Sequence, residues 1–421
     1  MQGILFPRGV VEGRENLQAY RARGGYEALA QALKGFSPGQ ILQEIADSGL
    51  RGRGGAGFPT GKKWAFTAES TETPHYMVLN GGEDEPGSKK DRLLMENLPH
   101  LVLEGLILAS YAVKASKAYL YINAIYEEAT RSMSDALAEA KAAGYWGEKI
   151  NAGGDFSLEI LLSPAPANYV AGEDTAALEV IEGKQPLPRQ KPPFPATAGL
   201  FGKPTAVNNV ETLANVAPII AHGAKWYRSF GTAESPGTMI FSMNEEVHRP
   251  GVYELPFGTP LRYLIEDCGG GVKSGNRIKA IQPGGPSSAY LPGEKIDIPL
   301  DHNSVRQAGS AIGCGVVHPI TTESCIVEET LRIAEFFSVE SCGQCPACRM
   351  ETNMLAAMLK KVQQGQGGQP ILDQFAKVIA FNKGKGFCNL VNMPGPPIES
   401  ALRLFRADFD SHLANGRCPQ G

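Results

Sequence analysis

The first half of the chain alternates between short apolar runs and longer amphipathic segments. Apolar runs with the length of buried strands occupy residues 75–80, 117–123 and 156–162. Apolar positions recur at helical spacing over residues 37–50, 99–114 and 126–144. Strands that alternate with helices are typical of an α/β layer built on a largely parallel sheet. We therefore predict an α/β fold class for this region.

The pattern changes twice further along the chain. Residues 184–205 are rich in Pro and Gly and poor in backbone donors, which predicts a long loop of the kind that is usually functional. Residues 238–292 contain short strand-like runs around one helix at Pro260–Cys268, which predicts a small α+β domain. From about Ile326 onward, four amphipathic segments with short connections predict a helical bundle. The predicted domains are residues 1–230, 231–325 and 326–421.

Composition and charge exclude several classes of protein. The 421 residues are 43% hydrophobic and 20% charged, as in a globular protein with a sizeable core. The net charge of −4 and the lack of a basic stripe argue against a nucleic-acid partner. The N-terminus lacks the layout of a signal peptide. The most apolar helical stretch, Leu101–Val113, contains Glu104 and is shorter than the ~20 apolar residues of a membrane span. We expect a buried core helix there, and a cytoplasmic protein.

Three of the eight cysteines lie close together, in the sequence SCGQCPACRM. Cys342, Cys345 and Cys348 have C-x2-C-x2-C spacing, and Cys388 follows further along the chain. A triplet with a distant fourth thiol is typical of a [4Fe–4S] cluster, whereas structural zinc sites usually come as two pairs. We therefore predict a cluster, with zinc as the alternative. The isolated cysteines, expected to be buried or incidental thiols, are Cys268, Cys314, Cys325 and Cys418, the last of them in a disordered tail.

A glycine-rich stretch, GLRGRGGAGFPTGKKW at residues 49–64, contains the pattern GxGxxG. In a Rossmann unit this fingerprint follows a strand and opens a helix. Here a predicted helix precedes it, and the following FPTGKKW is a poor helix start because of its Pro and Gly, so a Rossmann unit is disfavoured. Cations interleave with the glycines, and Phe58 and Trp64 offer flat rings. This favours an anionic, aromatic ligand over a flexible surface loop.

Three further segments carry candidate binding chemistry. Residues 80–92, NGGEDEPGSKKDR, follow a strand, where α/β proteins place ligands, although a charged turn is the alternative. Residues 172–174, Gly-Glu-Asp, open a helical pattern whose first N–H groups can bind an anion. Asn208 and Asn209 offer donors and acceptors of the kind that read a flavin's pyrimidine edge, although most Asn pairs form turns.

Together and in this order, these motifs resemble one family. The stretches GLRGRGGAGFPTG, KPPFP, GLFGKPTAVNNVETL, RPGVYELP and ESCGQCPACR are similar to those of the NADH-binding flavoprotein subunit of respiratory complex I and its relatives in NAD-linked hydrogenases and formate dehydrogenases. The resemblance runs from about Gly49 to Phe405. It implies a non-Rossmann α/β domain that binds FMN, a ubiquitin-like β-grasp domain, and a four-helix bundle with a [4Fe–4S] cluster. The implied activity is hydride transfer from NADH to FMN, followed by single-electron transfer to the cluster.

The resemblance also implies roles for individual residues. Lys63 would lie beside FMN, Glu85 at the nicotinamide end, Lys191 at the nucleotide and Asp174 at the ribose. The rings expected to sandwich the adenine are Phe58, Phe66 and Phe194. The loop residues expected to line both cofactors are Gly52, Arg53, Gly54, Gly55, Gly57 and Gly61. The residues expected to hold FMN are Asn80, Glu83, Tyr169, Gly172, Glu173, Asn208, Asn209 and Thr212. No general base is expected, because the cofactors carry the chemistry.

The chain departs from the family pattern near the implied site. An aspartate expected after the first strand is Gly82 here, although Asp84 stands close by, and the usual glutamate at position 174 is an aspartate. An acid at the ribose repels a 2′-phosphate, so we expect a preference for NADH over NADPH. These departures keep a second hypothesis open: a non-catalytic FMN and iron–sulfur electron relay or scaffold with weakened NADH binding.

Partners are implied by the same resemblance. Some relatives fuse a thioredoxin-like [2Fe–2S] domain ahead of the glycine loop, and about 48 residues precede that loop here, too few for a typical domain. We therefore expect a separate thioredoxin-like [2Fe–2S] subunit and a further iron–sulfur subunit in a hetero-oligomeric complex. Through that complex the chain would be peripheral on the inner face of the cell membrane.

Overall fold

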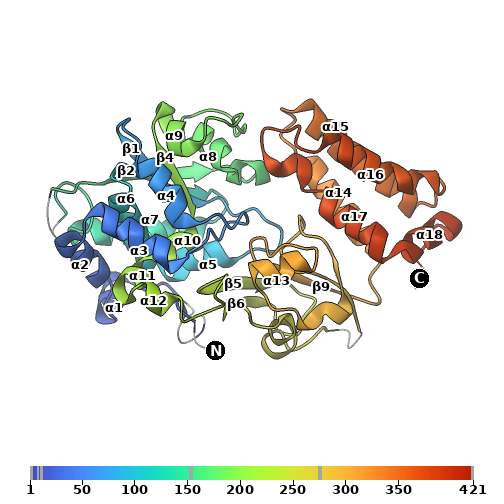
Figure 1. Cartoon of the computed structure of the whole chain (residues 1–421), viewed down its shortest axis with the longest axis horizontal. Coiled ribbons are helices and arrows are strands. Elements are labelled where there is room, and N and C mark those ends of the chain that lie inside the picture. Colours follow the sequence, from blue (N-terminus) through green and yellow to red (C-terminus); the bar gives the residue numbers. More distant parts are fainter. Residues whose placement is uncertain (1–2, 7–8, 10–12, 151–154, 274–276, 419–421) are drawn as a thin grey trace.

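The computed structural model in Figure 1 has three parts that follow one another along the chain. It describes residues 3–6, 9, 13–150, 155–273 and 277–418. The N-terminal part, coloured blue to green, is the largest. A smaller part with its own sheet lies beside it, and the red helices form the far end of the molecule. All three parts contribute residues to one cavity, which is the candidate site.

The N-terminal part is built on a four-stranded sheet with strand order β3-β2-β1-β4. Every neighbouring pair in it is parallel, which confirms the predicted parallel sheet. Its strands are β1 (His75–Gly81), β2 (Ala115–Asn123), β3 (Glu159–Ala165) and β4 (Thr205–Asn209). Strand β3 begins three residues later than predicted, and β4 is a strand that the sequence pattern does not predict. Because parallel strands end at the same edge of a sheet, β1 and β4 carry Asn80 and Asn209 to neighbouring positions.

Helices surround this sheet. They are α1 (Leu17–Ala22), α2 (Glu27–Gly35), α3 (Pro38–Ser48), α4 (Thr60–Ala68), α5 (Lys90–Asn97), α6 (Pro99–Ala112), α7 (Glu127–Ala142), η1 (Tyr169–Gly172), α8 (Asp174–Ile181), α9 (Pro195–Ala198), η2 (Leu200–Gly202), α10 (Val210–Ala214), α11 (Val216–His222) and α12 (Ala224–Tyr227). The predicted loop at residues 184–205 therefore contains two very short helical turns.

Helix α6 is the predicted buried core helix: every residue in it except Tyr111 is buried. Its one carboxylate, Glu104, has a structural reason to be there. It accepts hydrogen bonds of 2.9 Å from the backbone N–H groups of both Tyr26 and Leu29 and so satisfies donors at the start of α2. Among the described residues, no single helix is long and apolar enough to cross a membrane, and α5 with α6 reaches that length only across a bend of 100°.

The glycine-rich stretch lies between two helices, α3 and α4. The expectation of a poor helix start after it is wrong, because α4 begins at Thr60 with Pro59 as its N-cap, where a missing N–H costs little. The element before the stretch is a helix, as predicted, so the arrangement still differs from a Rossmann unit. Gly61 allows close packing of α4 on α3, since a Cβ there would lie 2.6 Å from the Ala46 Cα.

The second part contains a five-stranded sheet with strand order β6-β5-β9-β7-β8. Its elements are β5 (Thr238–Met243), β6 (Gly251–Pro256), η3 (Tyr263–Cys268), β7 (Ile278–Gln282), β8 (Leu291–Pro292), η4 (Gly293–Asp297), α13 (His302–Gln307) and β9 (Val316–Thr321). The three predicted strands and the one predicted helix are present. The missed strand β9 is central, because it pairs parallel with β5 and antiparallel with β7.

The C-terminal part is helical. Its elements are α14 (Ile326–Glu340), α15 (Pro346–Gln363), α16 (Pro370–Asn382), η5 (Asn389–Asn392), α17 (Gly395–Leu404) and α18 (Arg406–Asn415). The expectation of four helices is corrected by a break at Phe405, which divides the last predicted helix into α17 and α18. Buried residues from these helices, such as Phe337, Leu355, Phe375 and Phe409, form one core.

Candidate functional site

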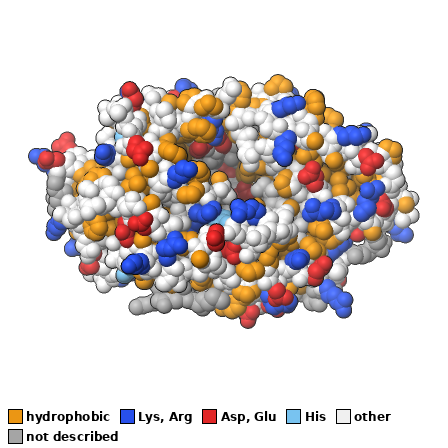
Figure 2. All heavy atoms as spheres, viewed as in Figure 1, with side chains coloured by type: hydrophobic (Ala, Val, Ile, Leu, Met, Phe, Trp, Pro, Cys, Tyr) orange, Lys and Arg blue, Asp and Glu red, His pale blue; other side chains and the backbone are white. Residues whose placement is uncertain are grey.

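A cavity of about 710 Å³ lies where the three parts meet. Figure 2 shows the molecule hollowed between its two lobes, with acidic side chains inside the hollow. Its walls come from the glycine loop, the segment after β1, the start of α8 and the end of β4. Residues 284–287 and 311–314 of the second part and 388–396 of the C-terminal part close it. The volume is that of a site for organic cofactors.

Most residues predicted to bind cofactors line this cavity. They are Gly52, Gly54, Gly55, Gly57, Phe58, Lys63, Asn80, Glu83, Glu85, Tyr169, Gly172, Glu173, Asp174, Lys191, Asn209 and Thr212. The structure therefore brings together segments that lie far apart in sequence. Five predicted residues are not among those that line it, and their positions have separate physical reasons. These are Arg53, Gly61, Phe66, Phe194 and Asn208.

Arg53 anchors the glycine loop from behind. Its buried guanidinium donates to the Thr238 carbonyl at 2.9 Å and to the Tyr227 hydroxyl at 2.9 Å, and it stacks on the Phe257 ring. Its backbone N–H donates to Thr212 Oγ1. Gly54 leaves room for Asn209, because a Cβ at this glycine would lie 3.2 Å from the Asn209 Cβ. The loop is thus fixed in place, with its glycine backbone facing the cavity.

The two asparagines predicted to read a flavin point in different directions. Successive side chains of a strand lie on opposite faces, so only one of an adjacent pair can face a ligand. Asn208 turns into the core, where its Oδ1 accepts a hydrogen bond of 3.1 Å from Trp64 Nε1. Asn209 faces the cavity and caps α10, with Oδ1 accepting from the N–H groups of Glu211 and Thr212.

The carboxylates after β1 have different surroundings. Glu83 accepts from the backbone N–H groups of Asp91 and Arg92, at 3.1 and 2.9 Å, and so holds the start of α5. Asp84 accepts from Asn123 Nδ2 at 2.7 Å, and its buried Oδ2 has no partner within the described chain. Burial raises the pKa of Glu85 to about 7, against a hydrogen bond with Tyr169 that lowers it. Glu85 is therefore the acid of this segment that titrates near neutral pH.

A second acidic pair stands at the start of α8. Glu173 is the N-cap and accepts from the backbone N–H groups of Thr175 and Ala176, each at 2.9 Å. Lys191 bridges the pair, with its Nζ 2.7 Å from Glu173 Oε1 and 2.8 Å from Asp174 Oδ1. Burial is the main reason that the pKa of Glu173 rises to about 7. Lys191 thus connects the Pro-rich loop to this wall of the cavity.

Two predicted adenine-binding rings lie outside the cavity wall. Phe58 lines the cavity and is 42% exposed, whereas Phe66 and Phe194 are 50% and 59% exposed. Phe66 lies on α4 and Phe194 is the N-cap of α9, and these two helices pack against each other. Large exposed aromatics are unusual unless they bind something, so their exposure is compatible with a ligand surface beside the cavity.

Sequence reasoning missed part of the cavity wall. In the sequence Lys90 belongs only to a charged turn and Cys314 is only an isolated thiol, yet both line the cavity. The remaining missed residues come from loops of the second and third parts. They include Gly284, Ser287, Ala311, Gly313, Asn389, Asn392, Met393 and Pro396. Only the three-dimensional arrangement brings these loops to the site, and their sequences carry no motif that signals it.

The four predicted cluster ligands meet in a second, smaller cavity, which Cys342, Cys345, Cys348 and Cys388 line together. Among the described residues, no three of their sulfur atoms lie within 4.8 Å of one another. A single zinc ion with Zn–S bonds of about 2.3 Å would bring its sulfur ligands closer than that, so the spacing favours a polynuclear cluster. Burial raises the pKa of Cys388 to about 12, so an iron core would be needed to hold it as a thiolate. The donor set therefore fits a [4Fe–4S] cluster.

The two cavities share part of their walls. Val170, Cys388 and Leu390 line both of them. A cofactor-sized cavity in contact with a four-thiol site places an organic cofactor directly beside a metal cluster. The fold and site together define the class: an electron-transfer protein that holds an organic redox cofactor next to an iron–sulfur cluster.

Comparisons with known proteins specify this class. Residues 45–218 match the Nuo51 FMN-binding domain, 245–290 the SLBB domain, and 328–412 the NADH-ubiquinone oxidoreductase-F iron-sulfur binding region. The chain is 42% identical over 403 residues to the second of the NADH-quinone oxidoreductase F subunits of Rhizobium meliloti (strain 1021), with 96% of both chains covered. It is 39% identical over 416 residues to the NADH-quinone oxidoreductase F subunit of Escherichia coli (strain K12), covering 96% of this chain and 93% of that one.

A solved structure agrees. A chain of the NAD+-reducing [NiFe]-hydrogenase in the H2-reduced state superposes with a TM-score of 0.84 at 32% identity, covering 96% of this chain and 67% of that chain. The chain therefore belongs to the family of NADH-quinone oxidoreductase F subunits. The resemblance found in the sequence is confirmed, as are its FMN-binding and iron–sulfur regions.

Proposed function

We propose that this chain is the NADH-oxidising flavoprotein subunit of a multi-subunit oxidoreductase. The observation that carries the proposal is the wall of Val170, Cys388 and Leu390 shared by the cofactor-sized cavity and the four-thiol cavity. Bound FMN would supply the conversion of a hydride electron pair from NADH into single electrons that an iron–sulfur cluster accepts. The chain itself binds and orients the cofactors and keeps water from the space between them.

The cavity walls suggest how the chain divides its work. The glycine loop, Lys63 and Asn209 would hold FMN, since they bring backbone N–H groups, a cation and an amide to one wall. Glu85 would lie at the nicotinamide end and Lys191 at the nucleotide. Phe58, with Phe66 and Phe194 on the adjoining exposed surface, would hold the adenine. Glu173, Asp174 and Tyr169 complete the opposite wall.

The experiment that tests this function uses the FMN-loaded chain with its cluster intact. Under anaerobic conditions NADH should bleach the flavin absorbance, and the same preparation should reduce ferricyanide with NADH. Absence of bleaching in a preparation that contains both FMN and iron would contradict the proposal. That result would instead favour the alternative, an electron relay or scaffold with weakened NADH binding.

One observation motivates the alternative. A Cβ at Gly82 would lie 3.2 Å from the Tyr121 ring and 3.3 Å from Asn80 Oδ1, so the position has little room for the aspartate that the family pattern expects. Asp84 lines the same cavity, and its buried Oδ2 is unpaired within the described residues. That oxygen is available to a cofactor, and for this reason we favour the enzyme over the relay.

Asp174 offers a test of nucleotide choice. Asp174→Asn removes a half-exposed negative charge but leaves Lys191 paired with Glu173. If Asp174 faces the ribose, we expect the ratio of kcat/KM for NADPH to that for NADH to rise about tenfold, because a screened charge contributes about 1.4 kcal/mol. Steady-state kinetics with both nucleotides measure it. Asp135→Asn, on the exposed side of α7, is the matched control, and an unchanged ratio in Asp174→Asn would place the discrimination elsewhere.

The partner subunits belong to the same proposal. A thioredoxin-like [2Fe–2S] subunit and a further iron–sulfur subunit would receive the electrons, with the complex peripheral on the inner face of the cell membrane. The names of the relatives support a subunit in a larger assembly. The proposal also includes a finer architecture: a ubiquitin-like β-grasp domain at residues 231–325 between an FMN domain at 1–230 and a helical cluster domain at 326–421.

A further inference from the structure

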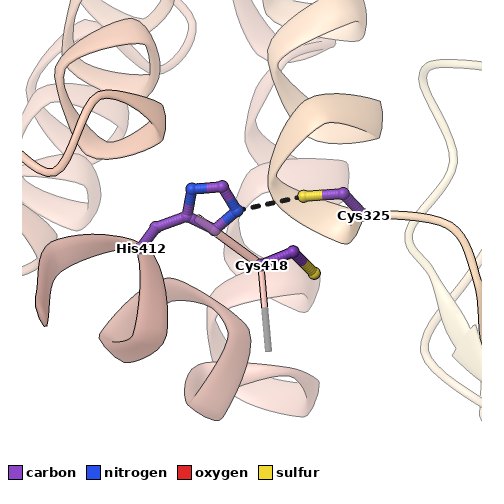
Figure 3. Close-up of side chains that lie close together, drawn as sticks. All are labelled: Cys325, His412 and Cys418. Carbon is purple, nitrogen blue, oxygen red and sulfur yellow. Dashed lines mark hydrogen bonds between the residues drawn. The ribbon is translucent and has the colours of Figure 1, made fainter. Parts of the chain in front are cut away.

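Two cysteines that the sequence presents as isolated meet a histidine on the far side of the helical part. Cys325, His412 and Cys418 each direct one candidate ligand atom to the same point, and these atoms all lie within 4.8 Å of one another. Figure 3 shows the three side chains converging, with His412 Nε2 3.1 Å from Cys325 Sγ. None of the three lines either cavity of the proposed electron-transfer site.

The histidine is held in the tautomer that a metal requires. His412 is 3% exposed, and its Nδ1 lies 3.1 Å from the backbone carbonyl oxygen of Gln363. A carbonyl oxygen only accepts, so Nδ1 carries the proton and donates it. The lone pair of the neutral ring is then on Nε2, the atom that faces the two sulfurs. Ligating histidines commonly have this arrangement, in which a carbonyl fixes the ring through its other nitrogen.

The backbone around each cysteine also suits a ligand. Cys325 is the N-cap of the fifteen-residue helix α14, whose positive dipole end favours a thiolate over a thiol. Cys418 follows the left-handed turn at Gly416, φ 66°, which ends α18 and folds the chain back toward His412. The Ser411 hydroxyl donates to the Arg417 carbonyl and holds this turn. Cys418 therefore lies in an ordered turn, contrary to the expectation of a disordered tail.

We propose that Cys325, His412 and Cys418 bind one divalent cation of the zinc class. Two thiolates and an imidazole are the ligands that Zn²⁺ prefers, and three protein ligands leave the fourth tetrahedral position to water. Binding displaces one proton from each thiol. The ion connects the end of α18 to the start of α14, where the chain passes from the second part to the helical part. This structural role is independent of the proposed redox function.

The imidazole is what distinguishes this site from a pair of thiols poised for a disulfide. A disulfide would use the two sulfurs and leave buried Nε2 without a partner, which costs free energy. A cation satisfies all three atoms together. The spacing explains why the sequence did not reveal the site: Cys325 lies 87 residues before His412, far outside the short repeats of familiar zinc motifs.

The test is the metal content of the complete, cofactor-loaded protein, grown with zinc and purified without chelator. Elemental analysis should find about one zinc per chain, besides the cluster iron. Cys325→Ser and Cys418→Ser should lose most of that zinc while keeping their iron and flavin. Cys268→Ser is the matched control, because Cys268 is also partly buried but lies outside the group, and it should keep its zinc. Zinc-edge X-ray absorption should show mixed sulfur and nitrogen ligation.

A further variant separates a metal from thiol chemistry. Cys418→His replaces one ligand by another and removes any possible disulfide, so it should keep its zinc. The proposal is overturned if wild-type protein contains no zinc and binds none in a calorimetric titration with Zn²⁺. It is also overturned if intact mass under non-reducing conditions shows the loss of two hydrogens that Cys325→Ser abolishes, since the pair is then a disulfide. Equal zinc in wild type and both serine variants would likewise reject it.

Discussion

Lys90→Met is expected to destabilise the chain by about 3–5 kcal/mol, because it removes one partner of a buried ionic group. Lys90 is 1% exposed, and its Nζ lies 2.7 Å from Asp91 Oδ1 and 3.1 Å from Glu211 Oε2. It also donates to Asn209 Oδ1 at 3.3 Å. Without the ammonium group, two buried carboxylates face each other, and the more distant Arg53, 3.9 Å from Glu211, cannot compensate for both.

Chemical denaturation of wild type and variant at neutral pH measures this loss. Lys89→Met is the control: Lys89 is the exposed neighbour, so its replacement should change the free energy of unfolding by less than about 0.5 kcal/mol. The deficit of Lys90→Met should also shrink below about pH 5, since unpaired buried carboxyls have raised pKa values and become neutral there. A deficit equal to that of Lys89→Met would mean that the group does not hold this wall of the cavity.

The variant also bears on the cofactor. Lys90 is a cation in the cavity wall, and its neighbours Asp91 and Asn209 are tied to it. Asn209 in turn caps α10 beside the glycine loop. If the ionic group positions Asn209, the variant should also bind FMN more weakly under conditions where it remains folded. Flavin fluorescence during titration measures this separately from stability.

Local patterns predict the elements that carry their own signal. The apolar run at residues 75–80 and the apolar helix around Leu101–Val113 are strand and core helix in the structure. Signals fail where the fold decides instead. Strand β4 has only five residues in a Pro- and Gly-rich region, and β9 takes its central place in the second sheet through pairing with β5 and β7. Neither position can be read from the residues themselves.

The site shows the same division. The glycine loop and the thiol triplet are compact motifs, and the structure places both at cavity walls. Side-chain direction needed the backbone: Asn208 packs on Trp64, while Asn209 faces the cavity. The role of Arg53 also needed the fold, because its partners Tyr227 and Thr238 lie far along the chain. Cys325 and Cys418 look isolated in the sequence for the same reason.

Cys388→Ser is expected to remove the iron–sulfur cluster from this chain. Cys388 is the one predicted ligand outside the triplet, and it lies in the wall between the two cavities. A serine hydroxyl is a poor ligand for iron compared with a thiolate, so three remaining thiols would hold an incomplete and labile cluster. Iron should fall from about four per chain to near zero, with loss of the visible absorbance and of the reduced-state EPR signal.

Cys314→Ser is the control that makes this result interpretable. Cys314 is also a cysteine of the large cavity wall, but it does not line the small cavity of the four thiols. It should keep the cluster, so loss of iron in Cys388→Ser alone would assign the effect to ligation and not to damage of the cavity. Both variants should still bind FMN. Unchanged iron and spectra in Cys388→Ser would place the fourth ligand elsewhere, and the shared wall would then no longer connect the two cofactors.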